Sequence, residues 1–119
     1  MQDRTTTVTD LKEQIKEFMQ ERDWVQFHSA KNVSMALACE AAELMEHFMW
    51  VESADSHTVF ETKRDAIEHE VADVAILLLE FCITNKIDLT EAIQTKMALN
   101  AHKYPVEKAK GKTLKYTEL

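Results

Sequence analysis

Hydrophobic residues recur at spacings of three and four along most of the chain, and this pattern predicts helices. Four ranges carry it: Val8–Arg22, Ala30–Trp50, Val59–Thr84 and Asp88–Lys103. The segments between them, residues 23–29 and 51–58, lack the pattern and are expected to be connections. The chain is therefore expected to be all-α, with four main helices.

Polar residues at the ends of these ranges support the boundaries. Thr9 or Asp10 is expected to cap the first helix, because short polar side chains accept hydrogen bonds from the free N–H groups of the first turn. Asp88, with Glu91 three residues later, has the spacing of a capping box for the fourth helix. That helix must end before Pro105, because the residue preceding a proline is pushed out of α geometry.

The second half of the third range is apolar on nearly every face. Over Val71–Ile83 the only acidic residues are Asp73 and Glu80. A helix that is apolar all round is buried all round, and one chain of 119 residues cannot cover every face. This segment predicts a homo-oligomer.

Composition narrows the class of protein. The chain has 119 residues and 13.7 kDa, which is one domain, with a single Gly and a single Pro. A fold of short strands needs turn residues far more often, so all-β architectures are excluded and α/β ones are disfavoured. The longest apolar run, Val74–Leu79, is too short to cross a membrane.

The N-terminus and the cysteines point to a compartment. Met1–Arg4 is polar and lacks the apolar core of a signal peptide. Cys39 and Cys82 form neither a disulfide framework nor a CxxC metal pair. The expected location is the reducing cytoplasm.

Charge is unevenly distributed. Residues 1–95 hold 19 acidic and 8 basic side chains, whereas residues 96–119 hold 6 lysines and 2 glutamates. The acidic body argues against nucleic acid as the main partner. The basic C-terminal segment suits a phosphorylated small molecule with bound cations, or it is a lysine-rich solvated tail.

Two acidic pairs are the candidate chemistry. Glu40 and Glu43 are three residues apart on the second predicted helix, and Glu70 and Asp73 are three apart on the third. Residues at this spacing project from one helix face. If the helices pack antiparallel, the four carboxylates can converge.

The neighbours of these pairs are small or apolar residues, in which repelling carboxylates would take up protons unless a cation neutralised them. An all-oxygen site suits Mg²⁺ or Mn²⁺. The alternative is ordinary acids on a helix surface. A ferritin-like di-iron site is disfavoured, because no histidine follows a glutamate at the Glu-x-x-His spacing that it requires.

Two further groups can contact a nucleotide. Lys96, Asn100 and Lys103 share one face of the fourth helix, which can bind phosphates or simply face solvent. Tyr104 lies at the end of that face. Aromatic residues near the ends of the first two helices can stack on a base or fill the core; the candidates are Trp24, Phe27, His28 and Trp50.

Four ordered motifs over residues 8–119 resemble the MazG-like all-α nucleoside triphosphate pyrophosphohydrolases, in their dCTP pyrophosphatase-like branch. Glu40-x-x-Glu43, followed after 26 residues by Glu70-x-x-Asp73, is similar to the family signature. The other three motifs are residues 22–28, which precede that signature, Lys96–Val106 on the fourth helix, and Lys115–Leu119 at the C-terminal end.

The resemblance implies Mg²⁺-dependent hydrolysis of (deoxy)nucleoside triphosphates, dCTP and related ones, to monophosphate and pyrophosphate. This is nucleotide-pool house-cleaning, with Mn²⁺ as a possible substitute for Mg²⁺. It implies a four-helix bundle assembled as a homotetramer, a dimer of dimers. Glu40, Glu43, Glu70 and Asp73 would be the catalytic metal ligands. Contacts to the triphosphate would come from Lys96, Asn100, Lys103 and Tyr104, and contacts to the base from Trp24, His28 and Trp50.

The chain departs from the dCTP branch at three positions. Ile15 replaces a histidine, Leu77 a tyrosine and Val51 a lysine. These differences fall around the nucleoside, so dCTP is expected to be accepted without being the only substrate. The alternative from another class is a non-catalytic helical interaction protein. Residues 1–119 are expected to form one domain without a membrane segment, with residues 1–7 and 107–119 flexible or extended.

Overall fold

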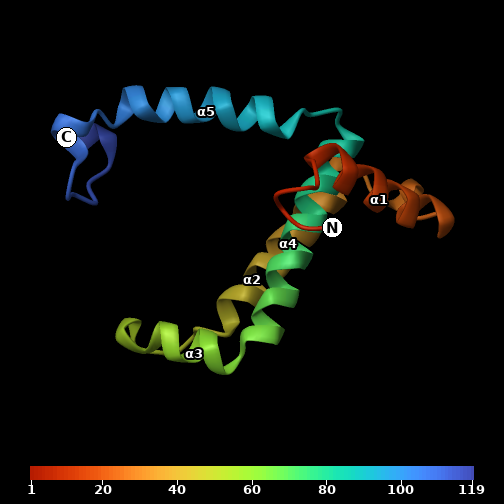
Figure 1. Ribbon diagram of the computed structural model, residues 1–119, viewed down its shortest axis with the longest axis horizontal. Helices are drawn as coiled ribbons and strands as arrows, with labels where there is room; N and C mark the ends of the chain where they lie inside the picture. The colour runs from red at the N-terminus through yellow and green to blue at the C-terminus, as the bar shows by residue number, and fades with distance from the viewer. The chain divides into compact units, whose positions relative to one another are not determined.

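The computed structural model describes residues 1–119 and is all-helical, which confirms the expected fold class (Figure 1). The α-helices are α1 (Val8–Glu21), α2 (Ala30–Glu46), α3 (Ser56–Thr62), α4 (Arg64–Thr84), α5 (Leu89–Lys103) and α6 (Val106–Ala109). Three short 3₁₀ turns complete it: η1 (Val25–Phe27), η2 (Ser53–Asp55) and η3 (Tyr116–Glu118). No helix is both long and apolar enough to span a membrane.

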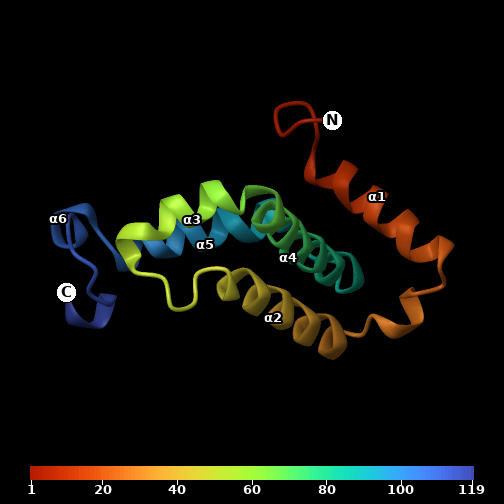
Figure 2. The same ribbon diagram turned by 90° about the horizontal axis from the view of Figure 1, so that it is seen from below.

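The chain divides into two compact units, Met1–Ile87 and Asp88–Leu119. In the first unit, α2 and α4 lie side by side and run antiparallel (Figures 1 and 2). α1 also packs against α4, and the Lys12 ammonium donates a 2.6 Å hydrogen bond to the Ile87 carbonyl just after α4. The most buried apolar side chains of this unit are Met19, Val33, Ile67, Leu79 and Cys82.

The cap of α1 differs from the expected one. Thr7, rather than Thr9 or Asp10, is the N-cap residue, and its hydroxyl accepts from the Asp10 N–H. The Asp10 carboxylate in turn accepts from the Thr7 N–H, so the two residues form a reciprocal capping box. Asp10 therefore takes part as the third residue of the helix. The backbone hydrogen bond from Thr7 is the main cause that lowers the pKa of the Asp10 carboxyl, and the Thr7 side chain lowers it further.

α2 begins as expected, with Ser29 as its N-cap, but it ends at Glu46 rather than Trp50. Beyond Glu46 the backbone tightens into i→i+3 hydrogen bonds, among them Phe48 N–H to Met45 O at 2.9 Å. Trp50 then has φ 62°, in the left-handed region. An aromatic side chain rarely adopts this conformation, and the α-helix cannot continue through it.

The third predicted helix is divided in two. It was expected over Val59–Thr84, but Lys63 (φ −112°, ψ 24°) separates α3 from α4. The Thr62 hydroxyl donates to the Thr58 carbonyl at 2.8 Å, a local hydrogen bond of the kind that bends helices. The 51–58 segment, expected to be a connection, contains η2 and the start of α3.

The second unit holds α5, α6 and η3. The Asp88 carboxylate accepts from the Glu91 N–H and caps α5. The helix ends at Lys103, before Pro105, as the sequence predicts. Residues 107–119, expected from the sequence to be flexible or extended, include most of α6 and all of η3.

Candidate metal centre

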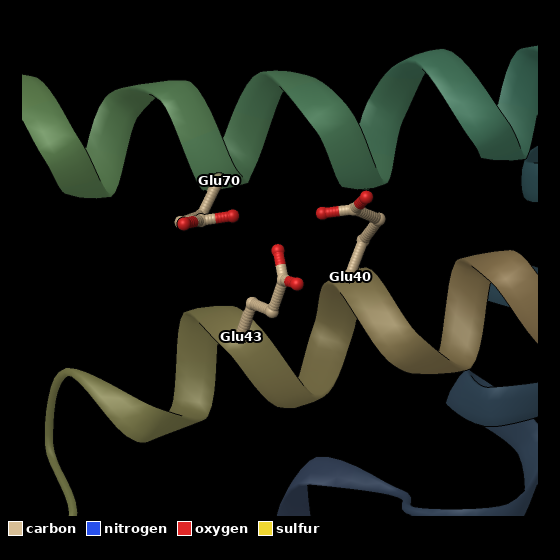
Figure 3. Close-up of side chains that lie close together, drawn as sticks. All are labelled: Glu40, Glu43 and Glu70. Atoms are coloured by element: carbon tan, nitrogen blue, oxygen red, sulfur yellow. The ribbon is translucent and has the colours of Figure 1, made fainter.

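Three glutamates from two helices converge on one point (Figure 3). Glu40 and Glu43 project from α2, and Glu70 projects from the facing side of α4. One carboxylate oxygen from each lies within 4.8 Å of the others. The antiparallel packing of α2 and α4 therefore brings together three of the four carboxylates that the sequence singled out.

Within this cluster, the interactions between the carboxyl groups raise the pKa of Glu40. Two ionised carboxylates cannot hydrogen-bond to each other, but a protonated Glu40 can bond to Glu43, and this is the main cause that raises the pKa of the Glu40 carboxyl. Burial and the negative charges of Glu43, Asp73 and Glu70 raise that pKa further. Asp73 thus acts on Glu40 through its charge, although it is outside the 4.8 Å group.

The donor set fits a hard divalent cation. Oε2 of Glu40 is buried and has no hydrogen-bond partner, so its desolvation is uncompensated. Carboxylate oxygens are the ligands that Mg²⁺ and Mn²⁺ prefer. A cation bound by Glu40, Glu43 and Glu70 would remove both their mutual repulsion and the unsatisfied oxygen.

His47 is a neighbour of the cluster that the sequence motifs do not predict. Its Nε2 lies 3.7 Å from Oε1 of Glu70, and the His47 side chain is 19% exposed. His47 is four residues after Glu43, so the two share one helix face. This i, i+4 spacing is the signal that could have identified it.

The aromatic candidates lie in different surroundings. Trp24 is half-exposed and contacts the Phe18 ring edge to face, with centroids 5.8 Å apart. His28 is partly buried, and its Nδ1 lies 3.0 Å from Sδ of Met19. Trp50 is 96% exposed in its left-handed backbone conformation. Phe27, which could also have filled the core, is exposed in η1.

The phosphate-binding candidates all lie in the second unit. Lys96, Asn100 and Lys103 are on α5, and Tyr104 follows directly. The Lys103 ammonium stands 4.7 Å from the centroid of the Tyr116 ring. Tyr104 packs edge to face on the same ring at 6.0 Å. Tyr116 therefore fixes the C-terminal end of this polar face.

Glu80 is a second residue with a notable environment that the sequence motifs do not predict. It is 6% exposed, and its Oε2 is buried without a hydrogen-bond partner. Burial raises the pKa of the Glu80 carboxyl, and the charge of His28, whose Nδ1 is 3.9 Å from Oε2, lowers it by less. An acidic residue inside the apolar Val71–Ile83 stretch was the available signal.

The fold and this cluster define a class: all-helical proteins with a carboxylate site between two antiparallel helices. Comparison with known proteins makes the class specific. The chain belongs to the MazG-like family, whose model matches residues 35–119. The resemblance seen in the sequence motifs is thereby confirmed.

Characterised relatives span nearly the whole chain. It is 37% identical to dCTP pyrophosphatase 1 of Rattus norvegicus over 115 residues, which are 95% of this chain and 68% of the relative. The human and bovine proteins of the same name are 36% identical with the same coverage. A crystal structure of a pyrophosphatase from Archaeoglobus fulgidus superposes with a TM-score of 0.81 at 34% identity, covering 88% of this chain and 98% of that one.

Proposed function

We propose that this chain hydrolyses deoxynucleoside triphosphates, dCTP among them, to the monophosphate and pyrophosphate, as a house-cleaning enzyme of the nucleotide pool. The chain is a nucleoside triphosphate pyrophosphohydrolase, as its similarity to dCTP pyrophosphatases and to a pyrophosphatase structure indicates. We also propose that it works in the cytoplasm and that nucleic acid is not its partner.

One observation of the structure carries the catalytic part of this proposal. Glu40, Glu43 and Glu70 converge, and one buried oxygen of Glu40 lacks a partner. We propose that these three carboxylates and Asp73 hold Mg²⁺, with Mn²⁺ as a substitute. Bound there, the metal would polarise the α-phosphate and lower the pKa of the attacking water.

Other steps of the reaction are assigned to individual side chains. A water attacks the α-phosphorus, and the bond to the bridging oxygen of the leaving pyrophosphate breaks. A carboxylate of this cluster, Glu40 in our proposal, accepts the proton from that water. Lys96 and Lys103 neutralise the charge that develops on the pyrophosphate, and Asn100 and Tyr104 complete the triphosphate contacts. Trp24, His28 and Trp50 contact the base.

Assembly is part of the proposal. The apolar surface of α4 is only partly covered within one chain, with Val71 50% and Leu78 38% exposed. α5 buries no residue. We propose four-helix bundles assembled as a homotetramer, a dimer of dimers, in which neighbouring chains cover these surfaces.

The test is pyrophosphate release from the four deoxynucleoside triphosphates, with and without Mg²⁺. Glu43→Gln and Glu70→Gln should each reduce kcat/KM by about 100-fold or more, since each removes a charged ligand for the metal. Their helical content by circular dichroism should be unchanged. Glu17→Gln, the same substitution at an exposed position of α1, is the matched control. Near-normal turnover in both site variants would contradict the metal assignment.

A further inference from the structure

A groove of about 390 Å³ lies between α1 and α4, within the first unit. Its walls are mostly apolar, with Ile15 and Phe18 on α1 and Ala72 and Ile76 on α4. The volume is that of a small-molecule site. Ala72 of this groove is adjacent in sequence to Asp73, whose charge acts on Glu40 of the acidic cluster.

One wall of this groove is held in place by stacked side chains. The Arg22 guanidinium lies 3.7 Å from the centroid of the Phe18 ring, and its Nη1 donates to the Phe18 carbonyl at 3.1 Å. Trp24 contacts the same ring from its edge. The groove therefore presents a fixed aromatic surface, against which a planar ring can pack.

Two polar side chains line the groove, Gln14 and Glu80. The Gln14 amide has both donor and acceptor groups and is exposed, so it can rotate to suit either kind of partner. Glu80 differs, because an ionised carboxylate accepts hydrogen bonds and donates none. It is also the buried one of the two, with an oxygen that has no partner.

A buried acceptor without a partner is destabilising until a ligand supplies a donor. His28 does not supply it, because its Nδ1 is 3.9 Å from Oε2 of Glu80 and lies closer to Met19, at 3.0 Å from Sδ. The missing partner is a donor group on a flat ligand that enters an apolar groove. The exocyclic amino group of a nucleobase has this chemistry.

We propose that Glu80 accepts a hydrogen bond from the exocyclic amino group of the bound base and thereby makes the enzyme prefer cytosine to uracil or thymine. This inference rests on the proposed function. Cytosine carries an amino donor at its position 4, with which a glutamate can pair. Uracil and thymine carry a carbonyl there, so two acceptors would face each other and neither would be satisfied.

The test compares dCTP with dUTP, which differ only at this edge of the base. The unmodified enzyme should show a kcat/KM for dCTP at least about tenfold above that for dUTP. Glu80→Gln should reduce this ratio about tenfold or more, mainly by improving dUTP, because the glutamine amide can donate to the carbonyl. Glu80→Leu should lose the preference by weakening dCTP. Glu17→Gln should leave the ratio unchanged.

The outcomes separate this inference from the proposed function. A purely structural Glu80 would slow both substrates equally in Glu80→Gln and leave their ratio unchanged, which would overturn the inference. A ratio near one in the unmodified enzyme would overturn it too, while pyrophosphohydrolysis stood. No release of pyrophosphate from any triphosphate would overturn the proposed function and this inference with it. Thermal unfolding shows whether each variant is folded. If Glu80→Leu does not fold, the result for Glu80→Gln alone is enough to test the inference.

Discussion

Single carboxyl groups in this protein behave according to what surrounds them. The Asp10 carboxylate accepts a hydrogen bond from the Thr7 N–H in its own helix cap, and its pKa is lowered. Glu40 faces like charges, and Glu80 faces apolar side chains, so the pKa of each is raised. The same functional group is thus a structural cap in one place and an unsatisfied, reactive group in two others.

The Glu80 pKa makes stability depend on pH in a definite direction. Because the folded state holds the Glu80 proton more tightly than the unfolded chain, Glu80 weakens the fold as pH rises from about its ordinary pKa of 4.5 through the raised one. Glu80→Gln should therefore raise Tm by about 3–6 °C at pH 7.5, and by clearly less at pH 4. Calorimetry at both pH values, with Glu17→Gln as control, measures this; an equal gain at both would contradict it.

The two ends of the nucleotide should respond differently to substitution. Lys96→Ala removes a charge-assisted contact, which should slow all four deoxynucleoside triphosphates by similar factors of about 10–100. Trp50→Ala removes an exposed aromatic surface and should change the ratio between a pyrimidine and a purine substrate. Steady-state measurement of kcat/KM for both variants on the four deoxynucleoside triphosphates tests this. The reverse pattern would mean that the roles are assigned to the wrong ends.

At the scale of the element, local hydrogen bonds set where helices begin and end. Thr7, Ser29 and Asp88 each accept from the third residue of the helix they precede. Pro105 stops α5. Lys63 and Trp50 interrupt helices without a proline or glycine at either position, so periodicity alone extended both predicted helices too far.

The capping box of α1 gives a measurable contribution. Thr7→Ala should lower the free energy of unfolding by about 1 kcal/mol, because the Asp10 N–H loses its acceptor. Thr9→Ala is the informative control, since Thr9 is exposed inside the helix and alanine has the higher helix propensity. It should change stability by less than about 0.5 kcal/mol. Urea denaturation at one fixed protein concentration measures the free energy of unfolding of both variants. An equal loss in Thr7→Ala and Thr9→Ala would contradict the assignment of Thr7 as the cap.

At the scale of the whole molecule, one chain buries few large side chains. The buried apolar residues are Met19, Val33, Ile67, Leu79 and Cys82, all of them in the first unit. In the second unit, Ile93, Met97 and Leu99 of α5 are about half-exposed. Apolar area of this extent is stabilised when a second surface covers it, which is the physical basis for the proposed assembly.

Light scattering should therefore give a mass about four times 13.7 kDa at micromolar concentration. Leu78→Lys places a charge on the exposed apolar face of α4. An obligate interface buries more than about 2,000 Å² of mostly apolar surface, so the buried charge should weaken the assembly and lower that mass. Thr84→Lys, at the exposed end of the same helix, should leave it unchanged. A 13.7 kDa species for the unmodified protein would contradict the assembly.

The sequence by itself determined the features that depend on neighbours within a few residues. Periodicity, caps and the single proline predicted the long helices to within a few residues at most ends. The spacing of three placed Glu40 with Glu43, and Glu70 with Asp73, on common helix faces. These features follow because the hydrogen bonds of an α-helix link residues four apart, so its boundaries and faces are local properties.

Only the tertiary structure decided which faces meet. The antiparallel contact of α2 with α4 brings Glu70 to Glu40 and Glu43 across about 30 residues of chain. The packing of α1 on α4 makes the groove and leaves Glu80 buried without a partner. Neither result can be derived from spacing along one helix, because both depend on long-range burial of apolar surface, which is not directional and does not fix a partner from sequence alone.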